Sequence, residues 1–322
     1  MAIALALATL LAGLVLLEAG ADRLTNAIGT LARRLRASES VIGLLTAGGE
    51  WEELVVVILA ITGGHPGLAV GNVIGSCLAN LIGSLPFGFL GARPLVPDRS
   101  ARIYAVVMLL VTVLASALLI DGRVGPLAGG VLVTVFALYV ASILIVLKQG
   151  WLRPPVDDDD DDDQGAGATA VSGPRLMGGL IVSLVVIALG AELVVRGAVD
   201  IAEHIGLSEY AIGATVVAFG TTLPDKAISF VGGRRGQGGV VTANATGSNI
   251  FVLTLVLGLA AVTSGSGLTI ARSIVRVDLP LLLAASVLIV VLFRRPSLHR
   301  GTGVTLLVGY VAYLAFALIR GG

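Results

Sequence analysis

Residues 71–76 read Gly-Asn-Val-Ile-Gly-Ser, and residues 243–248 read Ala-Asn-Ala-Thr-Gly-Ser. Each hexapeptide lies inside an apolar run, 68–90 and 239–263 respectively. Both runs reach the length of about 20 residues that crosses the hydrocarbon core of a bilayer. Because an amide, a glycine and a hydroxyl recur in the same order in both, we predict a membrane protein with an internal repeat.

The composition of the whole chain supports this interpretation. Of its 322 residues, 56% are hydrophobic and only 13% are charged, and the mean hydropathy is +0.98. Soluble domains carry about twice that share of charge. The zero formal net charge provides no field that would attract nucleic acid. We therefore predict an all-α, polytopic membrane protein with about ten transmembrane helices. Besides the two runs above, the predicted spans are 2–19, 40–62, 103–120, 126–147, 176–195, 210–231, 277–293 and 302–319.

The ten spans divide into two sets of five. Gly20-Ala21-Asp22 in the first half corresponds to Gly190-Ala191-Glu192 in the second. We predict a first repeat over 1–147, an acidic linker over 148–175 and a second repeat over 176–322. Because five spans separate equivalent helices, these cross the membrane in opposite senses. Inverted repeats of this kind are typical of secondary transporters, whose substrate lies near the midplane between the repeats.

The linker contains seven consecutive aspartates, Asp157 to Asp163. Such a run repels itself and buries nothing, so we interpret it as a solvated hinge, with a cation-sensing loop as the alternative. Under the predicted topology, fifteen Lys and Arg residues fall on one side of the membrane and five on the other. The positive-inside rule then predicts a multi-pass cell-membrane protein with both termini outside and the Asp-rich loop in the cytoplasm.

Polar residues inside the spans recur with one spacing. Ser76 follows Glu53 by 23 residues, and Ser248 follows Asp225 by 23 residues. A carboxylate at the bilayer centre costs several kcal/mol, so it is retained only with a partner or a water-filled path. Carboxylate, hydroxyl and amide oxygens together suit Na⁺ or Ca²⁺. We therefore predict small inorganic cations as ligands and no cofactor. The candidate ligands are Glu50, Glu53, Ser76, Asn80, Thr221, Thr222, Asp225, Ser248 and Asn249.

These motifs resemble those of the cation/calcium antiporter superfamily, which includes the sodium/calcium exchangers. In the second repeat, the resemblance rests on Gly-Thr-Thr-Leu-Pro-Asp at 220–225, followed by the asparagine-containing motif at 243–251. In the first repeat, it rests on the divergent Gly-Gly-Glu-Trp-Glu-Glu at 48–53, followed by 71–77. The resemblance covers nearly the whole chain.

The resemblance implies an antiporter that works by alternating access. Glu53 and Asp225 match the family's central cation-binding acids, and Ser76 and Ser248 match its serine ligands. Thr221 matches a hydroxyl position, and Glu50 and Thr222 occupy the positions that follow. Asn80 matches a further polar ligand of the first repeat.

The chain also departs from the family pattern. Gly49 and Glu50 stand where the first repeat usually has hydroxyl residues, and Val252 is the counterpart of Asn80. Lys226 follows Asp225 directly. It is interpreted either as a lysine that reaches the end of its span or as an internal counter-ion that replaces a bound cation.

We predict a secondary antiporter that exchanges Ca²⁺ or another hard cation against Na⁺ or H⁺. One alternative is a Na⁺/H⁺ antiporter with reduced divalent binding, and another is a transport-inactive cation sensor. An enzyme is not expected, because no nucleophile–base pair or phosphate-binding loop is found. The partners predicted are inorganic cations and the lipid bilayer, and the sequence indicates no oligomeric state.

Overall fold

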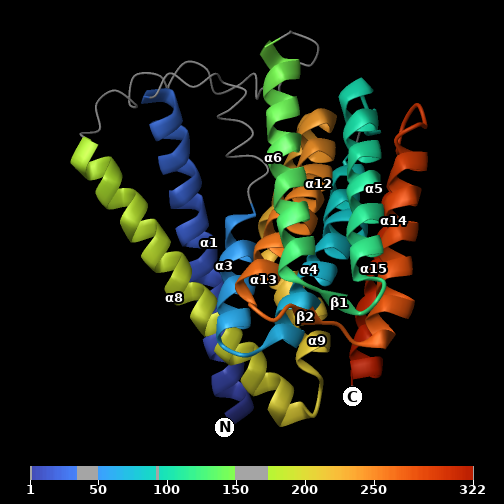
Figure 1. Ribbon diagram of the computed structural model, residues 1–322. Helices are drawn as coiled ribbons and strands as arrows, with labels where there is room; N and C mark the ends of the chain where they lie inside the picture. Colours follow the sequence, from blue (N-terminus) through green and yellow to red (C-terminus); the bar gives the residue numbers. More distant parts are fainter. Residues whose placement is uncertain (1, 35–49, 92–93, 149–172, 322) are drawn as a thin grey trace.

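The computed structural model describes residues 2–34, 50–91, 94–148 and 173–321 (Figure 1). The first half contains α1 (Ala2–Arg34), α3 (Trp51–Thr62), α4 (Pro66–Leu78), the π-helix η1 (Ala79–Ser84), the 3₁₀-helix η2 (Leu85–Phe89), α5 (Arg99–Leu119), β1 (Arg123–Val124) and α6 (Pro126–Lys148). The second half contains α8 (Gly173–Ile205), α9 (Glu209–Ile212), η3 (Gly213–Val217), α10 (Ala218–Thr221), α11 (Leu223–Arg235), α12 (Gly238–Phe251), η4 (Val252–Val256), α13 (Leu257–Thr263), β2 (Leu268–Thr269), η5 (Ile274–Asp278), α14 (Leu279–Leu292) and α15 (Arg300–Gly321).

Eight helical segments in the described residues are long and apolar enough to cross a membrane. They confirm an all-α, polytopic membrane protein. The remaining two predicted spans coincide with shorter helices. The first, 40–62, begins in residues that the structure does not describe and ends in α3, and the second, 210–231, is broken at Thr222. The total of ten therefore stays a prediction. The eight segments are Ile3–Leu24, Pro66–Phe89, Arg99–Leu119, Pro126–Ile143, Arg175–Ile205, Gly238–Thr263, Ile274–Leu292 and Arg300–Gly321.

Two helices are longer than predicted. The apolar runs 2–19 and 176–195 continue as helix into α1 and α8, each of which has 33 residues. At 1.5 Å per residue each helix is about 50 Å long, well beyond the roughly 30 Å of hydrocarbon. The polar extension of α8 remains helical because it carries helix-compatible charged residues, with an Arg196–Glu192 ion pair four positions apart at 2.6 Å. Hydropathy marks the membrane-embedded part, not the end of the helix.

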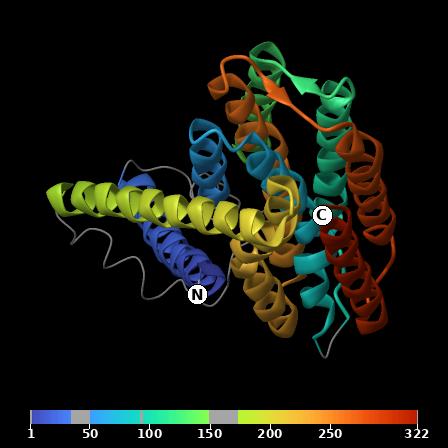
Figure 2. The same cartoon turned by 90° about the horizontal axis from the view of Figure 1, so that it is seen from below.

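α1 and α8 pack on each other and lean away from the other helices, as both views show (Figures 1 and 2). Glycines line their contact. A Cβ atom on Gly13 would lie 2.7 Å from the backbone nitrogen of Val194, and one on Gly197 would lie 2.7 Å from that of Leu10. Small residues allow close backbone approach between helices in a membrane, where apolar burial does not drive association.

The two hexapeptide motifs lie in the best-buried spans. In the span Pro66–Phe89 the most apolar window is 100% buried by other helices, and in Gly238–Thr263 it is 78% buried. The first span crosses η3 closely, since a Cβ atom on Gly75 would lie 2.4 Å from the carbonyl oxygen of Ala214. The motif glycine therefore permits a backbone contact at the centre of the molecule.

Both central spans change from α-helix to π-helix at corresponding places. η1 begins three residues after Ser76, and η4 begins four residues after Ser248. A π-helical turn accommodates an extra residue, which changes the direction of the following side chains. This detail is not readable from hydropathy.

Loops of the two halves pair at both ends of α5 and α14. β1 and β2 pair antiparallel, with Arg123 opposite Thr269, at the end where α5 finishes and α14 approaches. At the other end Leu95 and Leu298 form a bridge with backbone N–O distances of 3.0 and 2.8 Å. The first pairing joins the loop after α5 to the loop before η5, and the second joins the loop before α5 to the loop after α14. An inverted repeat requires this relation between opposite faces.

Candidate cation site

The acidic group of the first half lies at the beginning of α3. Glu50 is the residue before the helix, and Glu53 is in its first turn, where the helix dipole favours negative charge. Glu53 has an exposed fraction of 0%, and neither of its carboxylate oxygens has a hydrogen-bond partner among the described residues. Buried charges are normally paired, so this carboxylate requires a cation or a proton.

Glu52 joins this group. One carboxylate oxygen from each of Glu50, Glu52 and Glu53 lies within 4.8 Å of the other two. Glu50 is buried and Glu52 is half-buried. The geometry thus places Glu52 beside the other two carboxylates. Three carboxylates at such separations repel one another strongly unless positive charge is shared among them.

The acid of the second half, unlike Glu53, has a hydrogen-bond partner among the described residues. Asp225 lies in the first turn of α11, after the helix break at Thr222 and beside Pro224. The amide Nδ2 of Asn244 donates a hydrogen bond of 2.7 Å to Oδ1 of Asp225. Asp225 is 5% exposed and lies within electrostatic range of Glu50 and Glu53. The two halves therefore contribute their acids to one region of charge.

The threonines at the break in the second half use their hydroxyls locally. The hydroxyl of Thr221 donates to the carbonyl oxygen of Val217 at 3.2 Å, and that of Thr222 donates to Ala218 at 2.6 Å. Each hydroxyl oxygen keeps lone pairs after donating its proton. The Nζ atom of Lys226 donates to the Thr222 hydroxyl oxygen at 2.5 Å and to its carbonyl oxygen at 3.1 Å.

Buried polar oxygens without hydrogen-bond partners line the central spans. Both side-chain polar atoms of Asn80, the hydroxyl of Ser248 and Oδ1 of Asn249 have no partner among the described residues. Ser76 donates to Oδ1 of Asn72 over 3.5 Å, and Asn249 donates its Nδ2 to the carbonyl oxygen of Cys77 at 3.1 Å. Most buried polar atoms in proteins are paired. These oxygens form the donor set that a hard cation prefers.

The candidate residues of the two halves meet because helices of one half contact helices of the other. α11, which carries Asp225, contacts η1, which carries Asn80, while α3, which carries Glu53, contacts η4. α4 and α12 also contact each other. All the predicted site residues are buried in this central region, namely Glu50, Glu53, Ser76, Asn80, Thr221, Thr222, Asp225, Ser248 and Asn249. Their roles as ligands stay predictions.

Sequence reasoning did not assign three features of this region. Asn244 on α12 is the hydrogen-bond partner of Asp225 on α11. The sequence signal for this contact was the interval of 19 residues between Asp225 and Asn244, because residues at that interval can lie side by side on consecutive antiparallel helices. The inclusion of Glu52 and the contact between Lys226 and Thr222 depend on where α3 and α11 begin.

The profile of the sodium/calcium exchanger protein family matches residues 5–145 and 175–319. The chain belongs to the sodium/calcium exchanger family. Family membership means that the chain is a cation antiporter in a membrane and not an enzyme, as the motifs predicted. The side on which its termini lie stays a prediction.

Three relatives of this exchanger align over nearly its full length. The inner membrane protein YrbG of Escherichia coli is 31% identical, with 97% of this chain and 96% of the relative covered. The putative antiporter CaxA of Alkalimonas amylolytica is 29% identical over 94% and 95%. The sodium/calcium exchanger MaX1 of Methanosarcina acetivorans is 28% identical over 95% and 96%.

The exchanger also resembles solved structures. The sodium-calcium exchanger NCX_Mj soaked with 10 mM Na⁺ and zero Ca²⁺ superimposes with a TM-score of 0.66 at 27% identity, covering 97% of this chain and 99% of the other. A structure of NCX_Mj soaked with Na⁺ and Sr²⁺ gives a TM-score of 0.65 at 28% identity, covering 97% and 98%. The fold described above is therefore that of an ion exchanger.

Proposed function

We propose that this exchanger moves Ca²⁺ or another hard cation against Na⁺ or H⁺, with Glu53 and Asp225 as its central cation-binding acids. The observation that carries the proposal is the buried Glu53 carboxylate, whose two oxygens are unpaired and lie beside Glu50 and Glu52. A charge of this kind in a membrane is tolerated only with a partner. The exchanger MaX1 and the Na⁺- and Sr²⁺-soaked NCX_Mj structures support such cations as substrates.

The remaining ligands come from both halves. We assign Ser76, Asn80 and Glu50 from the first, and Thr221, Thr222, Ser248 and Asn249 from the second. The set contains oxygen atoms alone, which suits Na⁺ and Ca²⁺ better than zinc or copper. The charge of Glu53 and Asp225 is balanced by two monovalent ions, by one divalent ion or by protons. Exchange follows if the loaded forms change their access side and the uncompensated form does not.

Lys226 gives this exchanger a distinctive feature. Its ammonium contacts the Thr222 hydroxyl and carbonyl oxygens, and the carbonyl oxygen of Phe219 at 3.4 Å. It also lies 4.7 Å from the centre of the Phe219 ring. These oxygens belong to the turn that ends α10, where the helix dipole favours a cation. We propose that the ammonium occupies a monovalent-cation position and competes with a transported cation for the oxygens of Thr222.

This feature favours Na⁺/H⁺ exchange as the second candidate. A fixed ammonium lowers the positive charge that must be bound, while the three first-half carboxylates can share protons. Such a protein would take up Na⁺ in response to a pH gradient, and Ca²⁺ would compete weakly.

Flux in vesicles tests both candidates. The full chain is reconstituted, and uptake of radioactive Ca²⁺ and Na⁺ is followed under outward Na⁺ gradients and under pH gradients. Glu53→Gln is the inactive variant, and Glu203→Gln, at an exposed position on α8, is its matched control. Ca²⁺ uptake driven by Na⁺ or H⁺ supports the first candidate, whereas pH-driven Na⁺ uptake without Ca²⁺ competition supports the second. Uptake equal to that of empty vesicles under every gradient would contradict both and favour a transport-inactive sensor.

A further inference from the structure

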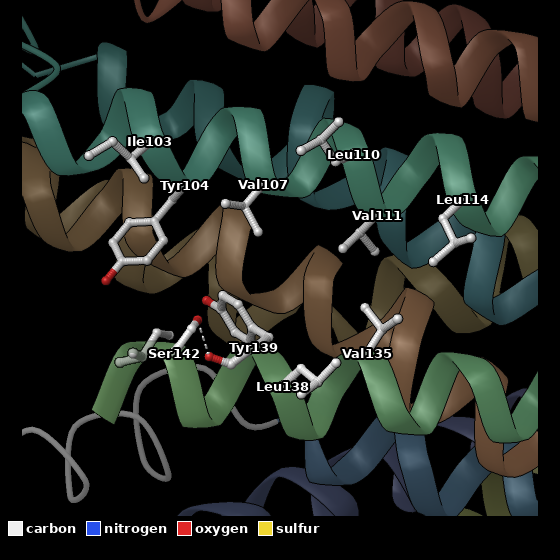
Figure 3. A pocket seen from close by; sticks show the side chains of 11 residues that line it. Ile103, Tyr104, Val107, Leu110, Val111, Leu114, Val135, Leu138, Tyr139 and Ser142 are labelled. Atoms are coloured by element: carbon white, nitrogen blue, oxygen red, sulfur yellow. Dashed lines mark hydrogen bonds between the residues drawn. The ribbon is translucent and has the colours of Figure 1, made fainter. Parts of the chain in front are cut away.

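An apolar groove runs between α5 and α6, away from the cation site. Its volume is about 410 Å³. Ile103, Val107 and Leu110 line it from α5, and Leu138 and Tyr139 line it from α6 (Figure 3). Leu110 and Leu138 are more than 60% exposed, so this wall faces outward from the helix bundle. In a membrane, such a groove faces lipid.

A second groove lies beside the first along α5. It has a volume of about 380 Å³ and runs between α5 and α14, with Val106 and Val290 among its lining residues. Ile103 and Val107 line both grooves, so the two are adjacent along α5. The two grooves therefore form one surface, which is divided by a ridge made of Ile103 and Val107.

Three arginines stand at one end of this surface. Arg99, Arg102 and Arg294 line the second groove, where α5 begins and α14 ends. All three side chains are exposed, and none forms an ion pair within the described residues. The Nε atom of Arg102 donates to the carbonyl oxygen of Phe293 at 3.1 Å, which orients its guanidinium. Three guanidinium groups that line one groove suit a phosphate.

The frame that carries the arginines is fixed. The Leu95–Leu298 bridge joins the loops at this end of α5 and α14. Halfway along the two helices, the hydroxyls of Thr112 and Ser286 lie 3.3 Å apart. The spacing between the arginines of α5 and the arginine of α14 is therefore set by the fold, not by a mobile loop.

We infer that this surface binds an anionic phospholipid with two acyl chains. The phosphate group contacts Arg99, Arg102 and Arg294, and one acyl chain enters each groove around the ridge of Ile103 and Val107. From Ile103 to Leu114 the groove spans about 16 Å of helix, close to half of the roughly 30 Å hydrocarbon core and so to one leaflet.

Two tyrosines support the placement of the arginine end of this site at the level of the lipid headgroups. Tyr104 and Tyr139 project toward the same end of the groove from α5 and α6 (Figure 3). Tyrosine is enriched at the level of the lipid headgroups, where its ring is apolar and its hydroxyl reaches water. The arginines, the tyrosines and the apolar groove thus follow the order of headgroup, interface and acyl chain. A soluble anion would use the arginines but not the grooves.

Native mass spectrometry of the purified full chain tests the inference with two defined lipids, dioleoyl phosphatidylglycerol and dioleoyl phosphatidylcholine. The anionic lipid should bind about tenfold more tightly, because each arginine near an anionic headgroup adds attraction. The variant Arg99→Gln/Arg102→Gln/Arg294→Gln should lose this preference. The matched control, Arg123→Gln/Arg272→Gln/Arg276→Gln, neutralises three exposed arginines at the opposite end and should keep it.

A second variant tests the groove itself. Ser142→Trp places a bulky ring in the groove from an exposed position on α6 and should weaken phosphatidylglycerol binding while the arginines remain. Equal binding of the two lipids to the wild type, or an unchanged preference in the triple arginine variant, would overturn the inference. The inference would also fail if the protein formed dimers that excluded the lipid from the two grooves.

Discussion

The beginnings of α3 and α11 occupy corresponding places in the two halves, yet they handle charge differently. α3 presents Glu50, Glu52 and Glu53 with their oxygens within 4.8 Å of one another. α11 presents one carboxylate, Asp225, which accepts a hydrogen bond from Asn244 and is followed by Lys226. One half concentrates three carboxylates, and the other holds a single carboxylate with an amide partner and a lysine as its neighbour in the sequence. Corresponding helix beginnings in the two halves therefore carry different charge.

The largest effect is expected from Glu53→Gln. This change removes the buried carboxylate whose oxygens have no hydrogen-bond partner among the described residues, so exchange should fall to the level of empty vesicles. The melting temperature without added cations should be unchanged or higher, because an unpaired buried charge has been removed. Scanning calorimetry and vesicle flux measure the two properties. A protein that keeps wild-type exchange would show that the first half does not carry the cation.

The next effect comes from the motif glycines. An alanine at Gly75 would place its Cβ atom 2.4 Å from the carbonyl oxygen of Ala214, whereas one at Gly247 would meet no atom within 4 Å. Gly75→Ala should lose about 1–3 kcal/mol of stability, as overpacked sites do, and Gly247→Ala should lose little. Melting temperatures in detergent distinguish them. Equal losses would mean that the close crossing of α4 and η3 is not specific to the first motif.

A smaller difference is expected between the two motif asparagines. Asn244→Ala deprives Asp225 of its amide partner, and a hydrogen bond to a charged group contributes about 1.5–3 kcal/mol. Cation affinity should therefore fall about tenfold or more. Asn72 contacts Ser76 over 3.5 Å, so Asn72→Ala should change affinity by less than about fivefold. Stabilisation of the protein by added Na⁺ and Ca²⁺ reports both values. The comparison of the halves is wrong if Asn72→Ala has the greater effect.

The smallest effect is expected from Lys226→Met. If the ammonium holds a monovalent-cation position, its removal should raise the Hill coefficient for Na⁺-dependent stabilisation by about one. Lys226→Arg should behave like the wild type, and Arg235→Met, at an exposed position on the same helix, is the matched control. Choline substitution separates Na⁺ binding from ionic strength. An unchanged Hill coefficient in a folded Lys226→Met protein would contradict the role proposed for this lysine.

The membrane fold was predictable because it follows from composition and run length, which act over some 20 residues at a time. The approach of Glu53 to Asp225 was also predictable, since the two residues share a repeated interval of 23 residues to a serine, while their roles as ligands stay predictions. Both inferences need only the order of residues along the chain. They do not require the direction of any side chain.

Contacts at the site could not be predicted in the same way. The reach of Lys226 back to Thr222 depends on the break between α10 and α11. The directions of side chains beyond Asn80 depend on η1, because a π-helical turn changes the phase of the helix. Glycine-rich and proline-containing segments allow several such breaks, so pattern alone leaves the helix face undetermined. The segments 35–49 and 149–172, which include Gly48, Gly49 and the Asp run, lie outside the described residues.

The pairing of loops at both ends of α5 and α14 has a mechanical consequence. Because α5 and α14 are joined at both ends and contact each other at Thr112 and Ser286 between, we expect them to move as one unit. They contact α12 and α4, which carry the motif residues. If an exchanged ion binds at the centre, these two helices present one rigid surface behind it. We then expect the change of access to come from movement between this unit and the remaining helices.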